Sequence, residues 1–314
     1  MRAIAVSEYG ATPSLMDLDR PEPGPGEILV KLVAAGVNPY DWKVADGAMK
    51  GAVEASFPLI LGQDGAGVVE EVGEGVDRYR TGDQVYGSFG AVPRGLGSYA
   101  EYAVVAADGP VATMPEKMVY SQAAAVPTAS MTAYNLVETT GVDEGKTVLV
   151  CGATGGVGQA VVQLAALKGA RVIATAGPDM TDTMLGLGAD QTVDHREGDL
   201  FESVTEAHPD GLDIVIDLVD DERRLDELAG AVRKGGVVAS TIGQANTAGL
   251  KKRGIRAVNF VNKASSELLA TLAELIDRGK LTVRIDREVD LADAPAALAE
   301  VKRGGARGKL VIRL

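Results

Sequence analysis

A strand, a glycine-rich turn and a helix follow one another between Thr147 and Gly177, and this stretch constrains the fold more than any other. It reads TVLVCGATGGVGQAVVQLAALKGARVIATAG. The apolar run over 147–151 predicts a strand buried on both faces of a parallel sheet. A helix ending near Gly169 and a second strand over 171–175 complete a β-α-β unit of about thirty residues, the size of a dinucleotide-binding unit.

Three glycines in this stretch, Gly152, Gly155 and Gly158, follow the spacing G-x-x-G-x-x-G. Glycine adopts backbone angles that other residues avoid and lets the main chain approach a ligand closely. The next helix directs its free N–H groups and the positive end of its dipole to the same place, which favours a bound pyrophosphate. We therefore predict a dinucleotide site on these residues: Gly152, Ala153, Thr154, Gly155, Gly156, Val157 and Gly158.

The end of the second strand, Thr175, Ala176 and Gly177, bears on which dinucleotide binds. An NAD site usually places Asp or Glu about twenty residues beyond the glycines, where it holds the ribose 2′-hydroxyl. This strand end has no carboxylate, which leaves room for a 2′-phosphate and favours NADPH. Asp179 lies close by and the next basic residue is Arg196, so NADH stays open as the less favoured cofactor.

The composition is that of a globular protein, and 314 residues are enough for two domains. A net charge of −13 argues against nucleic acid or an anionic membrane as partner, because both need a basic face. The sequence has no long apolar run and no leader, so we expect a cytoplasmic protein. Cys151 is interpreted as a buried hydrophobe, and His195 and His208 lack companions at metal-ligand spacing, so no metal is expected.

The sequence pattern changes near Ser121, where we expect the cap of a helix. Before it, short strands and Gly-rich turns predict an all-β unit, a barrel or a sandwich. After it, strands alternate with helices, one of them over 222–233, which predicts a doubly wound parallel sheet. The predicted strands of this sheet are 147–151, 171–175, 191–194, 213–219, 237–242 and 256–261.

The tail from Ser265 leaves this alternation and most simply returns to the β-rich domain. Its predicted elements are a helix ending at Gly279, a strand over 281–285, a helix over 294–303 and a strand over 309–314. We therefore predict two domains, one made of residues 1–121 and 265–314 and the other of residues 122–264.

Several further motifs occur in a fixed order. They are Ala35-Gly36-Val37-Asn38-Pro39, Leu61-Gly62-Gln63-Asp64-Gly65-Ala66-Gly67, Gly82-Asp83-Gln84-Val85-Tyr86-Gly87, the loop from Gly152 to Gly158, Leu187-Gly188-Ala189-Asp190 and Gly308-Lys309-Leu310-Val311. In their order and spacing the chain resembles the medium-chain dehydrogenase/reductase superfamily, and within it the zinc-free NADPH:quinone oxidoreductase branch. The resemblance implies an α/β protein: a GroES-like β-barrel domain built from both termini, an inserted Rossmann domain and an active site between them.

The positions at which this sequence differs from the zinc enzymes of the superfamily indicate which reaction it catalyses. Zinc alcohol dehydrogenases carry Cys at Asn38 and a His-Glu pair at Gln63 and Asp64, and neither Asn38 nor Gln63 is a competitive zinc ligand. The resemblance thus implies hydride transfer from NADPH to a quinone or an α,β-unsaturated carbonyl, both already polarised. Two alternatives are an enoyl-thioester reductase on the same scaffold and an NADPH-binding sensor or structural protein with little turnover. A homodimer through the edge of the cofactor sheet is also implied.

The segment after Gly36 holds the candidate catalytic residues Asn38, Tyr40 and Lys43, which offer an amide, a phenol and an ammonium within one loop. The matching Asn of similar quinone and alkenal reductases contacts cofactor or substrate. The alternative is that Tyr40 packs in the barrel and Lys43 is a solvated charge. We expect Asp64 to cap the turn that follows it rather than to act in catalysis.

The resemblance assigns further residues to the nicotinamide cofactor. They are Thr128, Thr132, His195, Arg196, Ser240, Thr241, Ile242, Asn259, Phe260, Val261 and Lys309. For Thr128 and Thr132, a helix cap and a packed hydroxyl explain the residues equally well.

Overall fold

The computed structural model describes residues 1–194, 196–305 and 307–314, and the chain forms two compact units. Unit 1 comprises Met1–Met131 and Ala264–Leu314, and unit 2 comprises Thr132–Lys263. The first boundary lies within helix α3 (Pro127–Thr140), later than residue 121, where the sequence analysis placed it.

Unit 2 is a six-stranded sheet in the order β11-β10-β9-β12-β13-β14, parallel throughout. The predicted doubly wound sheet is confirmed. Its strands are β9 (Thr147–Cys151), β10 (Arg171–Thr175), β11 (Gln191–Val193), β12 (Leu212–Asp217), β13 (Val232–Ser240) and β14 (Arg256–Asn259). Its helices after α3 are α4 (Gly156–Leu167), α5 (Thr181–Gly186), α6 (Leu200–Ala207), α7 (Glu222–Leu228) and α8 (Thr247–Lys252).

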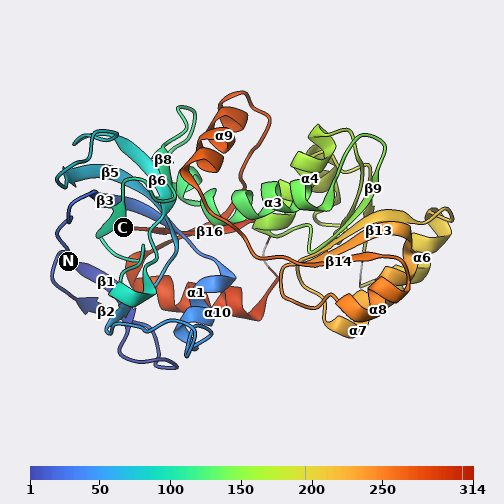
Figure 1. Cartoon of the computed structure of the whole chain (residues 1–314), viewed down its shortest axis with the longest axis horizontal. Coiled ribbons are helices and arrows are strands. Elements are labelled where there is room, and N and C mark those ends of the chain that lie inside the picture. The colour runs from blue at the N-terminus through green and yellow to red at the C-terminus, as the bar shows by residue number, and fades with distance from the viewer. Residues whose placement is uncertain (195, 306) are drawn as a thin grey trace. The chain divides into compact units, whose positions relative to one another are not determined.

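Helices cover both faces of this sheet, with α4 on one side and α7 and α8 on the other (Figure 1). Leu225 and Leu228 of α7 pack with Leu149 and Val215 of the central strands in one buried apolar cluster. The helix predicted over 222–233 ends at Leu228, because β13 already begins at Val232 and pairs with β12.

Unit 1 is rich in β-structure and includes the tail from Ala264 to Leu314. One sheet has the order β2-β1-β4; the other has the order β15-β16-β3-β5-β6-β8, with β7 also paired to β3. The strands are β1 (Arg2–Val6), β2 (Ser14–Asp17), β3 (Glu27–Gly36), β4 (Leu59–Ile60), β5 (Asp64–Val72), β6 (Gln84–Ser88), β7 (Tyr102–Ala106), β8 (Val111–Thr113), β15 (Ile285–Asp290) and β16 (Lys309–Arg313). The helices are α1 (Pro39–Ala45), α2 (Tyr120–Ala124), α9 (Ser266–Asp277) and α10 (Ala294–Arg303).

Two predicted elements of this unit were misplaced. The strand expected over 281–285 begins only at Ile285, because Ile285 is the first residue in register with Lys309 of β16. Val119, not Ser121, holds the N-cap position of α2, and the side chain of Gln122 accepts a hydrogen bond from the Val119 N–H.

Candidate functional site

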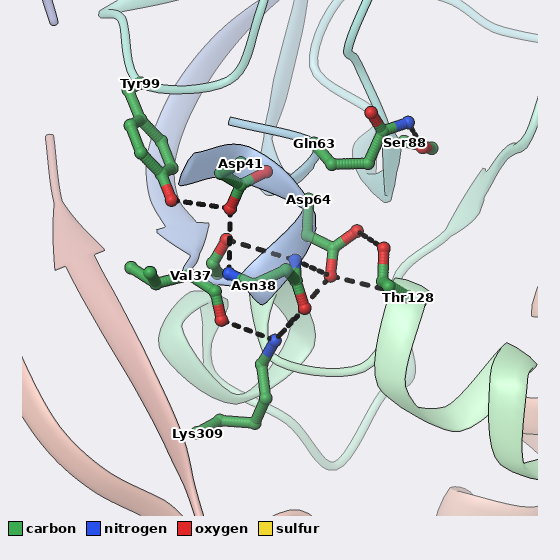
Figure 2. Close-up of polar contacts among 10 residues, drawn as sticks. Val37, Asn38, Asp41, Gln63, Asp64, Ser88, Tyr99, Thr128 and Lys309 are labelled. Atoms are coloured by element: carbon green, nitrogen blue, oxygen red, sulfur yellow. Dashed lines mark hydrogen bonds and ion pairs between the residues drawn. The ribbon is translucent and has the colours of Figure 1, made fainter. Parts of the chain in front are cut away.

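The junction of β3 and α1 places Asn38 at the centre of a buried polar cluster in unit 1 (Figure 2). We define the Asn38 cluster as Asn38, Asp41, Asp64, Tyr99, Thr128 and Lys309. The segment predicted as a loop is in fact helix α1, with Pro39 as its first residue. The side chain of Asp41 accepts the Asn38 backbone N–H at 2.7 Å. The amide side chain of Asn38 is thereby left to point away from the helix end.

Both ends of the Asn38 amide bind groups from distant strands. Its Nδ2 donates to Asp64 Oδ2 at 2.9 Å, and its Oδ1 accepts a hydrogen bond from Lys309 Nζ at 2.5 Å. Lys309 also donates to the carbonyl oxygen of Val37 at 3.0 Å and lies 3.9 Å from Asp64. In the structure the Lys309 ammonium therefore faces Asn38, and its contact with the cofactor stays a prediction.

Asp64 is the best satisfied carboxylate of the Asn38 cluster. Its Oδ1 accepts the Thr128 hydroxyl at 2.6 Å, and its Oδ2 accepts the Thr128 backbone N–H at 3.0 Å (Figure 2). Asp64 does not cap a turn, because Gly65 and Gly67 continue strand β5 after it. The expectation of a turn cap was wrong. Thr128 contacts Asp64, and its predicted contact with the cofactor stays a prediction.

The Asn38 cluster holds two buried carboxyl groups and one buried ammonium group. Asp41, Asp64 and Lys309 are 2%, 0% and 4% exposed. Burial raises the pKa of Asp41 to about 7, although hydrogen bonds from the Tyr99 hydroxyl and the Asn38 N–H oppose this rise. Burial also raises the pKa of Asp64 and lowers that of Lys309, in each case against the attraction between the two charges.

Among the described residues, the side chains of Tyr40 and Lys43, the other two candidate catalytic residues, make no hydrogen bond to the Asn38 cluster. Tyr40 is 39% exposed, and burial of its ring, followed by the charge of Asp41, raises its pKa. The Lys43 ammonium lies 5.6 Å from the centre of the Trp42 ring. Tyr40 is exposed and Lys43 is half-buried, so both lie on a partly solvent-accessible side of α1.

The glycine loop of unit 2 has the geometry that the sequence predicts. Gly152 has φ +76°, in the left-handed region that favours glycine, and Gly155 is the N-cap of α4. A Cβ atom on Gly158 would lie 2.5 Å from the Cα atom of Ala153. Gly158 therefore lets α4 pack closely against the loop. An open helix start beside partly exposed main chain fits a nucleotide pyrophosphate.

Thr175 and Arg196 organise the end of β10. The Thr175 hydroxyl accepts a hydrogen bond from the Gly152 N–H at 3.0 Å, and this bond holds the start of the glycine loop against β10. The guanidinium of Arg196 lies so close to Gly177 that a Cβ atom there would overlap it. Of the other predicted residues here, Ala176 is buried, and His195 lies outside the described residues.

Two carboxylates surround the Arg196 guanidinium. Asp194 accepts its Nε at 3.0 Å and its Nη2 at 3.1 Å, and Asp179 lies 3.7 Å away. The Arg196 side chain is 54% exposed, so the group is open to solvent. A cation thus lies at the strand end where an NADP site needs one, but this cation is already paired with Asp194 and Asp179.

The structure brings together the predicted residues at the ends of β13 and β14. The Ser240 hydroxyl accepts the Ile242 N–H at 3.3 Å, and the Ser240 carbonyl oxygen accepts the Phe260 N–H at 2.8 Å. Thr241 donates its N–H to the carbonyl oxygen of Asp217 at 3.1 Å. The Asn259 amide binds the backbone of the same loop at Ala245. The two predicted residues left over, Val261 and Thr132, are respectively 83% and 8% exposed.

The sequence did not mark three residues that hold the site together: Asp41, Tyr99 and Asp217. Asp217 ends β12, is fully buried and accepts the Ser240 hydroxyl at 3.1 Å. Burial raises its pKa to about 6, while hydrogen bonds from the Asp220 and Val219 N–H groups oppose this rise. An aspartate three residues after a helix-capping position was the signal for Asp41. Tyr99 left no such signal.

A cavity of about 420 Å³ lies in unit 2 at the amino ends of its strands, at the end of the sheet opposite the glycine loop. Lys146, Arg171 and Arg233 line it together with Asp213. Asp213 accepts a hydrogen bond from Arg233 and lies 3.6 Å from Lys146, so these charges pair with one another. We do not include this cavity in the candidate site.

Comparison with known proteins defines the class. Residues 24–116 match the model of the alcohol dehydrogenase GroES-like domain, and residues 187–312 match that of the zinc-binding dehydrogenases. The 2-methylene-furan-3-one reductase of Solanum lycopersicum is 32% identical over 99% of this chain and 79% of its own length.

Two solved structures match the whole chain. A quinone oxidoreductase from Coxiella burnetii is 31% identical, with a TM-score of 0.90, over 100% of this chain and 99% of that one. An Escherichia coli quinone oxidoreductase complexed with NADPH is 25% identical, with a TM-score of 0.89, over 100% of both chains. The chain is thus an oxidoreductase with a GroES-like and a Rossmann domain. It belongs to the quinone oxidoreductase branch of the medium-chain dehydrogenase/reductase superfamily.

The Asn38 cluster already contains a cation. The Lys309 ammonium binds the Asn38 oxygen and is buried with it. Among the described residues, no group of three His, Cys, Asp or Glu side chains could hold a metal ion. Within the same residues, no helix is both long and apolar enough to cross a membrane.

Proposed function

We propose that the protein is an NADPH-dependent reductase of quinones or α,β-unsaturated carbonyls that transfers hydride directly and without zinc. The observation that supports this most is the Lys309 ammonium on the Asn38 oxygen, a cation built into the protein in place of a metal. The relatives named a quinone oxidoreductase and a furanone reductase support the acceptor class, and the NADPH complex supports the cofactor.

The residues divide the work as follows. NADPH, when bound, supplies the hydride. The glycine loop binds the pyrophosphate through its main chain, and Arg196 holds the 2′-phosphate. Tyr40 and Lys43, which are not engaged in the Asn38 cluster, orient the acceptor oxygen. The amide of Asn38 is bound at both ends, so we assign it the role of fixing Asp64 and Lys309 beneath that oxygen.

The acceptor assay tests this function directly. We expect NADPH to be oxidised by 1,4-benzoquinone, 9,10-phenanthrenequinone and a simple enone at rates that a metal chelator leaves unchanged, because no step needs a Lewis acid. The absorbance of NADPH reports the rate. A rate lost with the chelator and restored by zinc would contradict the proposal. Faster reduction of a crotonyl thioester than of the quinones would identify an enoyl-thioester reductase. Tight binding of NADPH without turnover would identify a sensor.

Replacing Arg196 with alanine tests the choice of cofactor. We expect the Kd for NADPH to rise roughly tenfold, about 1.4 kcal/mol, while that for NADH stays near its starting value, because only NADPH has the 2′-phosphate. Arg171→Ala at the other end of β10 is the matched control and should change neither Kd. Equal losses for both cofactors in Arg196→Ala would contradict the assignment.

The assembly and the compartment are further parts of the proposal. Strand β14 lies at one edge of the unit 2 sheet, and an unpaired edge is a liability that a second copy of the chain would remove. We therefore propose a homodimer through this edge. The cytoplasmic location expected from the sequence is a separate part of the proposal. Light scattering gives the mass of the particle in solution and tests the dimer.

A further inference from the structure

An enone needs a proton as well as a hydride, and the structure points to where that proton is held; this inference rests on the proposed function. The two oxygens of Asp41 have unequal surroundings. Asp41 Oδ2 accepts both the Asn38 N–H and the Tyr99 hydroxyl, each at 2.7 Å. Asp41 Oδ1 is buried and has no hydrogen-bond partner among the described residues. A buried oxygen without a partner is destabilising, because it has lost its hydrogen bonds to water.

The residue that carries the unpaired oxygen lines a small cavity. Its volume is about 20 Å³, and its walls include Asp41, Tyr40, Gly62 and Gln63. A water molecule needs roughly 10–15 Å³ and two to four polar partners. In Figure 2 the unpaired oxygen points away from the Tyr99 hydroxyl, to the side on which Gln63 lies. Tyr40 is partly exposed, so the cavity lies beneath a residue that solvent reaches.

The charges of the Asn38 cluster indicate which carboxyl group is protonated. One ammonium, that of Lys309, faces two carboxyl groups that are both buried, so one of these two is neutral at neutral pH. Asp64 receives donors on both oxygens and lies 3.9 Å from Lys309, which favours its ionised form. Asp41 is left with the proton. Since both donors point at Oδ2, we place that proton on Oδ1, the unpaired oxygen of a residue that lines the cavity.

We propose that Asp41 supplies the proton of the reduction, passing it from Oδ1 through a water molecule held in this cavity to an acceptor bound beside Tyr40. Hydride adds to the β-carbon of the enone, where a C–H bond forms as the C=C electron pair shifts to give an enolate. The α-carbon of the enolate takes a proton from the water, and the water takes one from Asp41. The Asp41 carboxylate then regains a proton from solvent.

The groups around Asp41 set its protonation. Burial is the largest influence and raises its pKa; the nearby charge of Asp64 adds to the rise. The Tyr99 hydroxyl, the Asn38 N–H and the positive charge of Lys309 lower it. Tyr40, the residue before Asp41 in α1, has a raised pKa, so it is a neutral phenol at neutral pH. The resulting pKa of about 7 lets Asp41 both give and regain a proton near neutrality.

The protonation of Asp41 can be measured in the cofactor-free protein by infrared spectroscopy. We expect the wild-type spectrum minus the Asp41→Asn spectrum to show the carbonyl stretch of a neutral carboxylic acid below pH 7 and its loss as the pH rises through about 7. Asp217, whose pKa is raised to about 6, contributes to both spectra and cancels in the difference. Asp46→Asn is the matched control, because Asp46 lies just after α1 and pairs with Lys302 on the surface. The same band in Asp41→Asn and in the wild-type protein would overturn the proposal.

The rates and the stereochemistry of reduction then test whether Asp41 supplies the proton. In Asp41→Asn we expect enone reduction to fall by on the order of a hundredfold and quinone reduction to fall much less, because the oxygen anions of the reduced quinone take protons from solvent. In D₂O the wild-type enzyme should deuterate one face of the α-carbon, and Asp41→Asn both faces. Equal losses on the two acceptors with unchanged deuteration would overturn the proposal. A wild-type protein inactive on both acceptors would refute the proposed function, and the infrared result would still decide the state of Asp41.

Tyr99→Phe is a second variant in case Asp41→Asn does not fold. It removes one donor from Asp41 Oδ2, so the pKa of Asp41 should rise. The infrared titration and the alkaline limb of the enone rate should both move to higher pH. If Asp41 has a purely structural role, the infrared titration moves but the alkaline limb of the enone rate does not.

Discussion

Replacing Gly158 with alanine is expected to abolish cofactor binding and to destabilise the protein by about 3 kcal/mol. The added methyl group would overlap the Gly152 carbonyl oxygen and lie 2.5 Å from the Cα atom of Ala153. All of these atoms belong to main chain that neither a rotamer change nor a flexible side chain can relieve. The loop must therefore move away from the start of α4, and the pyrophosphate site opens. Titration with NADPH and thermal unfolding measure the two effects.

Gly155→Ala is the matched control for this change. Gly155 has φ −76°, which any residue adopts, and its nearest neighbour for an added Cβ atom is the Gly152 oxygen at 3.6 Å. The same substitution three residues earlier should cost less than about 1 kcal/mol, the loss expected for alanine at an N-cap. If Gly158→Ala bound NADPH as the wild-type protein does, close packing of α4 on the loop would not be what forms the site.

The sheet of unit 2 could be predicted because its signals are local. A strand buried on both faces is an apolar run, and the predicted strands over 147–151 and 171–175 coincide with β9 and β10. The end of a helix was harder to predict where a strand follows it after only a few residues, as β13 follows α7. The residues from Val232 continue the apolar pattern of α7 but pair with β12, so the predicted helix was too long.

The Asn38 cluster could be predicted only in part, because its partners come from distant segments. Asn38 and Lys309 lie 271 residues apart in sequence, and Asp64 and Thr128 lie 64 apart. A motif can mark each residue as important, but it does not say which hydrogen bond each one makes. Asn38 was predicted to contact cofactor or substrate, and the sequence did not show that its amide binds Asp64 and Lys309.

Replacing Lys309 with methionine is expected to destabilise the protein by about 3–5 kcal/mol at neutral pH, because it removes one partner of a buried ion pair. Methionine keeps most of the volume of the lysine side chain, so the loss comes from charge rather than from a cavity. Lys302→Met is the matched control. The Lys302 ammonium pairs with Asp46 at 2.5 Å, but both side chains are half exposed, and such pairs contribute about 0–1 kcal/mol. Urea unfolding of the two variants compares them.

The pH dependence of the Lys309→Met effect identifies its cause. Asp64 and Asp41 have raised pKa values in the folded protein, so the folded state gains protons on them before the unfolded state does as the pH falls. Without Lys309 these pKa values rise further, because its charge lowers both of them. The destabilisation should therefore be largest above pH 7 and shrink toward pH 4, as the uncompensated carboxylates become neutral. A loss that stays constant over this range would mean that Lys309 acts through packing and not as the cation that balances the buried carboxylates.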